Sequence, residues 1–135
     1  MDDVKVNRRP LQASMTRQMK FSMRDLPMLK QGTTYDPLAT AENLWASVKV
    51  YASGGENALH SHSTEDHLFV IMQGKATFHF GDGSSTEARQ FEGVMIPRNV
   101  QYRFEADEAE NLVLLRVGGC GREGKGVEQL SAHGT

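Results

Sequence analysis

The chain has 135 residues and little of several features on which common folds and functions depend. Its single cysteine, Cys120, excludes a disulfide within the chain. No apolar run approaches the roughly 18 residues that a membrane span needs. The first 20 residues lack the apolar core of a signal peptide. We therefore expect a cytoplasmic protein that has no membrane partner.

The chain also has no large excess of either positive or negative charge. Lysine and arginine together number 15 against 17 acidic residues, a formal net charge of −2, so no strong positive field would attract a nucleic acid. The basic residues near the start are interpreted as part of a solvated arm, and we predict no nucleic-acid partner. The length suits one domain with its own core and is too short for two ordinary domains.

Composition divides the chain into three segments. Residues 1–20 mix polar, charged and isolated apolar residues, and we expect an N-terminal arm that packs on the domain or on a partner subunit. Met15 and the two methionines that follow it at four-residue spacing give only a weak helix signal, because clear caps are missing. Residues 119–135, rich in glycine and charge, are predicted to form a flexible C-terminal tail. Residues 21–118 are the predicted domain.

Hydrophobic alternation predicts that this domain is built from strands. In residues 44–52 one face is apolar, and the other includes Trp45 and Tyr51. Further strands are expected at residues 68–72, 76–80, 94–96, 101–104 and 112–117, with a short one before Phe91. Many short strands joined by glycine and aspartate turns, with almost no helix, predict an all-β sandwich or barrel.

The apolar run at residues 68–72 predicts a strand that is buried on both faces. A small barrel has limited core with which to cover both faces. We therefore predict an isologous homodimer that forms through one sheet.

Three of the five histidines lie close together in the sequence. His60 and His62, two residues apart, place both imidazoles on one face of an extended segment, where they can chelate a divalent transition metal. His67 opens the next strand, and an antiparallel return would bring it back to the pair. The alternative is that His60 and His62 are surface residues and His67 is a hydrogen-bonded core residue. Their close spacing favours a site for one metal ion.

This spacing resembles a known motif. Gly54, His60, His62, His67 and Gly74 follow one another at the intervals of the first cupin motif, in which a glycine, two histidines, a glutamate and a glycine occur.

The second cupin motif is similar to the stretch from Phe91 to Ala106, although only Pro97 is identical and Asn99 replaces the turn glycine. The resemblance covers residues 40–118. It implies a single-domain double-stranded β-helix (jelly-roll) barrel, a bound divalent metal and a dimer.

Two positions depart from the family pattern. The glutamate position is His67, and the fourth ligand, normally histidine, is Tyr102. The two acidic residues before His67 could substitute for the glutamate, but the six-residue interval to the final glycine of the motif selects His67. Carried over residue by residue, the resemblance implies that His60, His62 and His67 hold the metal and that Tyr102 faces it.

Such a site suggests catalysis. Three neutral imidazoles would leave the ion its full double charge and leave positions open for water and substrate. Iron, zinc, manganese, nickel and copper are all compatible with these ligands. Tyr102 has three possible roles: a fourth ligand, a general acid/base at one remove from the metal, or a packing residue.

Aromatic and apolar residues on the predicted inner faces are candidates for the wall of a substrate pocket, with plain barrel core as the alternative. They are Trp45, Tyr51, Phe69, Ile71 and Phe104. Arg98 and Arg103 could anchor a carboxylate, although exposed arginines are more often simply solvated. His79 is expected to face away from the metal set.

The leading functional hypothesis is a metal-dependent enzyme that acts on a small organic molecule. An all-histidine site resembles those of cupin dioxygenases, so a dioxygenase is the first subclass, and a lyase or isomerase that works through an enolate is the second. The alternative is a non-catalytic cupin in which the metal anchors a small ligand or ties strands together.

Overall fold

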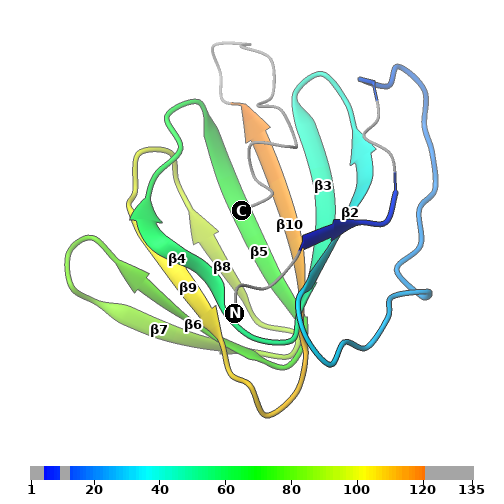
Figure 1. Ribbon diagram of the computed structural model, residues 1–135. Coiled ribbons are helices and arrows are strands. Elements are labelled where there is room, and N and C mark those ends of the chain that lie inside the picture. Colours follow the sequence, from blue (N-terminus) through cyan, green and yellow to red (C-terminus); the bar gives the residue numbers. More distant parts are fainter. Residues whose placement is uncertain (1–4, 10–12, 121–135) are drawn as a thin grey trace.

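The structure is a computed structural model that describes residues 5–9 and 13–120. These residues form ten strands and no helix (Figure 1). The strands are β1 Lys5–Asn7, β2 Thr33–Thr40, β3 Leu44–Tyr51, β4 Gly55–His60, β5 Glu65–Gln73, β6 Lys75–Phe80, β7 Ser85–Arg89, β8 Gly93–Ile96, β9 Tyr102–Ala106 and β10 Leu112–Cys120. The predicted all-β class is confirmed. The described part of the chain also lacks any helix with the length and apolarity of a membrane span.

Two sheets face each other across the interior. The larger has the order β1-β2-β3-β10-β5-β8, and the smaller has the order β4-β9-β6-β7. Every neighbouring pair is antiparallel except β1 and β2. In Figure 1 the chain passes from one sheet to the other between β3 and β4 and back between β4 and β5. This is the predicted jelly-roll barrel.

Three of the ten strands, β1, β2 and β4, go beyond the strands expected from the sequence. Strand β2 contains Asp36 and Pro37, which sheets usually disfavour, and its register with β3 shifts next to Pro37. The register between β4 and β9 shifts between Glu56 and His60. Local propensity does not predict either strand, because pairing with other strands determines their extended conformation.

The core of the barrel lies between the two sheets and is rich in aromatic rings. Phe69 comes from the larger sheet, and Phe78 and Phe104 come from the smaller. Their ring centroids lie 5.2–5.7 Å apart, a separation at which tilted aromatic pairs attract one another. All three side chains are fully buried. The packing of these rings holds the two sheets together.

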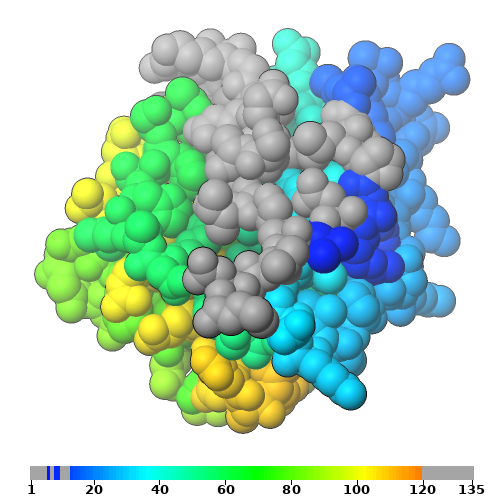
Figure 2. Space-filling model, viewed as in Figure 1, coloured from blue at the N-terminus to red at the C-terminus, as the bar shows by residue number. Residues whose placement is uncertain are grey.

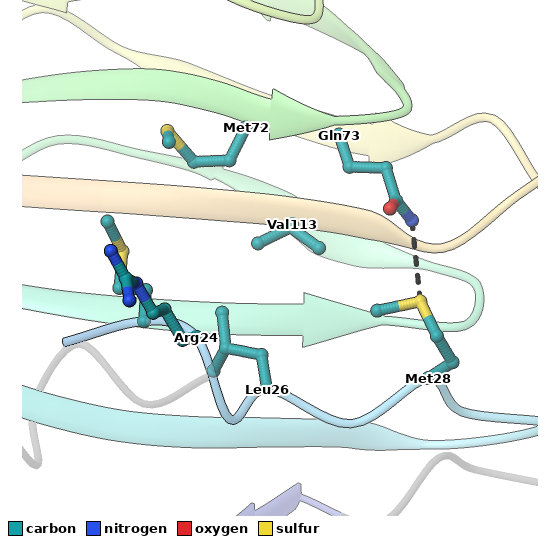
Figure 3. Close-up of a pocket in the computed structure, with 7 residues that line it drawn as sticks. Arg24, Leu26, Met28, Met72, Gln73 and Val113 are labelled. Carbon is teal, nitrogen blue, oxygen red and sulfur yellow. Dashed lines mark hydrogen bonds between the residues drawn. The ribbon is translucent and has the colours of Figure 1, made fainter.

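The outer face of the larger sheet is covered by the chain itself. Residues 23–29 run across it and pack against apolar side chains of the sheet. In Figure 3, Leu26 and Met28 of this segment line a cavity together with Met72 and Val113 of the sheet. The homodimer was predicted because an apolar strand needs cover on both faces. Residues 23–29 supply part of that cover from within the chain, and the homodimer stays a prediction.

The N-terminal arm adds a strand where the sequence indicated none. Strand β1 pairs in parallel with β2, and Figure 2 shows the dark-blue residues of the arm beside the cyan β2 region. Arg8 and Arg9 both contact one carboxylate oxygen of the buried Asp36, at 3.1 and 3.2 Å. Met15 forms an isolated bridge with Ala41, so the methionine spacing does not make a helix here. The described part of these residues packs on the barrel, and the predicted division into an arm, a domain and a tail stays a prediction.

The contact between Gly118 and Trp45 joins β10 to β3 near one end of the barrel. A Cβ atom at Gly118 would lie 2.4 Å from Trp45 Cζ2, so only glycine leaves room for the indole. Trp45 is 1 % exposed and is the only tryptophan of the chain. This packing fixes the direction of the indole N–H.

The Gly118→Val variant should therefore push the indole out of its place. We expect a loss of about 1–3 kcal/mol in the free energy of unfolding and a changed emission of Trp45. Urea unfolding followed by tryptophan fluorescence measures both. Val117→Ala, a change on the opposite face of the same strand, is the control and should leave the emission unchanged. An unaltered emission in Gly118→Val would contradict this packing.

Candidate functional site

The structure brings the three predicted histidines together, although not by the expected hairpin. His60 ends β4 in the smaller sheet, whereas His67 lies on β5 in the larger sheet. Strands β4 and β5 do not pair with each other; β4 pairs with β9, and β5 pairs with β8 and β10. The ring centroids of His60 and His62 are 5.3 Å apart, and those of His62 and His67 are 4.1 Å apart. The cluster therefore spans the gap between the sheets.

Tyr102 joins the cluster from β9, where it pairs with His60 in the register of the smaller sheet. Its ring centroid is 4.4 Å from that of His60, and its hydroxyl lies 3.2 Å from His62 Nε2. The side chain of Tyr102 is fully buried, whereas His60 and His62 are partly exposed. Solvent therefore reaches the cluster at the two imidazoles, and the tyrosine lies behind them.

Arg116, on β10, lies at the centre of the cluster and was not among the predicted site residues. Its Nη2 donates to the hydroxyl of Tyr102 at 2.6 Å. The same nitrogen lies 3.3 Å from His62 Nε2 and 3.2 Å from His67 Nδ1. Arg116 is 3 % exposed, and its guanidinium carbon is 4.8 Å from the ring centroid of Phe69. Three polar atoms, one from each of these side chains, thus converge on one guanidinium nitrogen.

Glu56, on β4, supplies the counter-charge and was also missed. Its Oε2 accepts from Arg116 Nη1 at 2.5 Å, and its Oε1 accepts from the hydroxyl of Tyr102 at 3.1 Å. His60 Nε2 is 2.9 Å from the same Oε1. Burial alone would raise the pKa of this carboxyl, but the charge of Arg116 and the bond from His60 lower it to about 2. Glu56 is therefore ionised at neutral pH.

The bond to Glu56 also determines the state of His60. The carboxylate raises the pKa of His60, and partial burial opposes this effect. His60 Nδ1 lies 2.7 Å from the carbonyl oxygen of Ala58, which also favours a protonated ring. Both ring nitrogens of His60 thus face acceptors and not the centre of the cluster.

His67 is held from behind by a second buried carboxylate. Glu65 accepts from the indole N–H of Trp45 at 2.8 Å through Oε2, and His67 Nε2 is 2.9 Å from its Oε1. Since a guanidinium only donates, Nδ1 accepts from Arg116, and in the neutral ring Nε2 then carries the proton that faces Glu65. Glu65 lies two residues before His67 and points to the same inner face, whereas Asp66 is exposed and binds the backbone N–H of Arg98.

The other candidate residues lie outside the cluster. Arg98 contacts Asp66, and Arg103 contacts Glu105, both at 3.7 Å, so neither arginine points into the barrel. His79 pairs with Glu105 on the outside of the smaller sheet and faces away from the histidine cluster, as expected.

The five residues predicted to line a pocket are packed in the interior. Trp45, Tyr51, Phe69, Ile71 and Phe104 are each at most 2 % exposed. Four of them belong to the main core cluster, and Trp45 packs against Tyr35. Their role in binding a substrate stays a prediction.

Comparison with known proteins identifies the family. A family model described as "Cupin domain" matches residues 47–118, more than half of the chain. The chain belongs to the cupin family. No curated protein matches this cupin.

Solved structures agree with the family match at the level of the fold. The cupin domain of Cnp3 from Schizosaccharomyces pombe aligns with a TM-score of 0.67 and 19 % identity, over 82 % of this chain and 84 % of that one. A putative mannose-6-phosphate isomerase from Ralstonia eutropha gives 0.66 and 17 %, over 78 % and 100 %. KdgF from Halomonas sp. gives 0.65 and 13 %, over 79 % and 97 %.

The family pattern implies a divalent metal, and the donor atoms of this cupin can be tested against it. Within the described residues, no group of three or more histidine, cysteine, aspartate or glutamate side chains is arranged to hold an ion. His62 and His67 turn a nitrogen toward the centre, but His60 turns its Nε2 to Glu56.

The guanidinium of Arg116 lies at the point toward which these two imidazole nitrogens are directed. A doubly charged ion about 3.5 Å from this fixed charge would be repelled by roughly 9 kcal/mol at an effective dielectric constant of about 20. As arranged, the residues do not fit a metal bound by three imidazoles.

Glu56 should give this cupin an acid-sensitive component of stability. Its pKa is lower in the folded chain than its ordinary value of 4.5, so the stabilisation is complete above that pH and is lost as the pH falls toward about 2. The Glu56→Gln variant should lack this component. It should also lose about 3 kcal/mol or more at neutral pH, because Arg116 is left without its counter-charge.

Urea unfolding of both proteins from neutral pH down to about pH 2 measures these effects. Glu87→Gln, at a half-exposed surface carboxylate, is the control and should follow the wild-type curve. Parallel pH curves for the wild type and Glu56→Gln would show that the buried pair does not work as described.

Proposed function

We propose that this cupin is an enzyme that moves a proton next to the carbonyl group of a small organic molecule, in a lyase or isomerase reaction. One observation carries the proposal. The hydroxyl of Tyr102 is held by three groups that can exchange protons or stabilise charge: Arg116 Nη2 at 2.6 Å, Glu56 Oε1 at 3.1 Å and His62 Nε2 at 3.2 Å. Such a tyrosine is positioned for acid–base chemistry.

His62 is the residue that would touch the substrate, because its imidazole is partly exposed and its Nε2 faces the tyrosine. The imidazole takes a proton from the carbon next to a carbonyl group, which leaves an enolate. The imidazolium then gives a proton to the oxygen of Tyr102 while that hydroxyl passes its own proton to Glu56, and the reverse transfers return a proton to the enolate. Arg116 stabilises negative charge on the phenolic oxygen by donating to it. Tyr102 thus acts at one remove from the substrate.

This arrangement changes the order of the two subclasses expected from the sequence. A dioxygenase depends on a redox metal or cofactor, whereas proton transfer needs only the hydrogen-bonded groups that the cluster contains. The lyase or isomerase reading is therefore proposed first. The non-catalytic alternative, in which the cluster only holds a small ligand, predicts binding without turnover.

Hydrogen exchange in deuterated water tests the proposal without a known substrate. The wild-type protein should catalyse the loss of the proton signal next to the carbonyl group in at least one of pyruvate, acetoacetate, oxaloacetate and acetylacetone, followed by proton NMR. Tyr102→Phe keeps the ring but removes the relay, and the exchange rate should fall by on the order of a hundredfold.

His79→Gln is the matched control, since His79 also pairs with a carboxylate but lies outside the barrel, and its exchange rate should equal that of the wild type. The temperature of unfolding of each variant shows whether it is folded. A rate with the wild type that equals the rate in buffer alone for all four compounds, or an unchanged rate in folded Tyr102→Phe, would refute the proposal.

A further inference from the structure

The cluster has a permanent positive charge at its centre, in the place where the family pattern implies a metal ion. We infer that the guanidinium of Arg116 occupies that place in the working protein, and that this cupin has a metal-independent site with arginine as its cation. The inference concerns the same cluster as the proposed function, but it is tested by metal binding, so the two can fail separately.

The first support is the convergence of acceptors. Nη2 of Arg116 lies within 3.3 Å of an oxygen of Tyr102 and of one nitrogen each of His62 and His67. Polar atoms with lone pairs around one point are what a cation needs, and here the charged nitrogen of Arg116 lies at that point. An ion at the same point would have to displace this nitrogen.

The second support is the orientation of the imidazoles. Glu65 bonds to Nε2 of His67, and Nδ1 of the same ring is directed at the guanidinium. His60, which the motif would use as the first ligand, is instead directed to Glu56 at 2.9 Å and to the carbonyl of Ala58 at 2.7 Å. The motif histidines are therefore engaged in bonds suited to an arginine-centred network.

The third support is the way Arg116 is held. Strand β10 lies in the interior of the larger sheet, paired with β3 on one side and β5 on the other. The guanidinium is bonded through Nη1 to Glu56 and packs against the ring of Phe69. Charge and packing both oppose a retreat of this side chain that would leave room for an ion.

This assignment has a chemical consequence. A guanidinium stays protonated and has no accessible redox state, so it can hold and stabilise negative charge but cannot activate oxygen. Its reactions are then proton transfers at compounds that become anionic, such as enolates. Chelating agents should leave such a reaction unchanged.

The first experiment uses the full-length wild-type protein. Elemental analysis of protein purified without an affinity tag should find no stoichiometric transition metal. Added Co²⁺ or Zn²⁺ should leave the temperature of unfolding unchanged, and Co²⁺ should not quench Trp45, whose ring centroid is 5.5 Å from that of His67. Since Trp45 is the only tryptophan, a quenched emission would report directly on this cluster.

The second experiment exchanges the cation. Arg116→Gln removes the positive charge beside His62 and His67, so Co²⁺ should bind this variant tighter than the wild type by on the order of a hundredfold or more. Arg116→Lys keeps a positive charge and should still exclude the ion. Arg103→Gln, at a surface arginine on β9, is the matched control and should behave as the wild type.

The possible results of these experiments distinguish the metal-independent site from the proposed function. Failure of Arg116→Gln to fold leaves the wild-type measurements as the test. A stoichiometric metal in the wild type, or quenching of its Trp45 by Co²⁺ that disappears in His60→Ala, would overturn the inference. That result would leave the proposed proton transfer standing, because the exchange assay can still detect it. A metal-free wild type without exchange activity would overturn the proposed function alone.

Discussion

The ion pair between Arg116 and Glu56 is the interaction on which the rest of the site depends. Glu56 belongs to the smaller sheet and Arg116 to the larger, so the pair joins the two layers of the barrel. Removing two charges from water is costly, and bonds to Tyr102, His60 and the other imidazoles offset part of this cost. The ion pair thus requires a polar network around it, and that network is the candidate site.

The sequence predicted the overall fold well. Alternation of apolar residues along 44–52 and the turns around Gly74 and Gly81 follow from short-range rules, and the strands appear where those rules put them. Gly74 has a φ of +84°, and a Cβ there would lie 2.7 Å from the carbonyl oxygen of Asn111, so the turn requires glycine. Strands β2 and β4 were missed because long-range pairing, and not local propensity, holds them in extended form.

The site was predicted in part. Spacing gathered His60, His62 and His67, the resemblance to the cupin motifs added Tyr102, and the structure brings these four side chains together. Spacing could not show that Arg116 fills the space between them, because a single sequence does not reveal distances across the barrel. A signal was present nonetheless: Arg116 occupies an inward position of a strand whose neighbouring inward residues are Leu114 and Gly118. An arginine at an inward position between apolar residues requires a buried acidic partner.

The central claim is that a guanidinium, and not a metal ion, occupies the centre of the barrel. A crystal structure of the wild-type protein grown with Zn²⁺ tests this most directly, through an anomalous-difference map recorded at the zinc absorption edge. We predict electron density for the guanidinium bonded to Glu56 and Tyr102, and no anomalous peak between His62 and His67. A peak ligated by His60, His62 and His67, with Arg116 displaced, would contradict it.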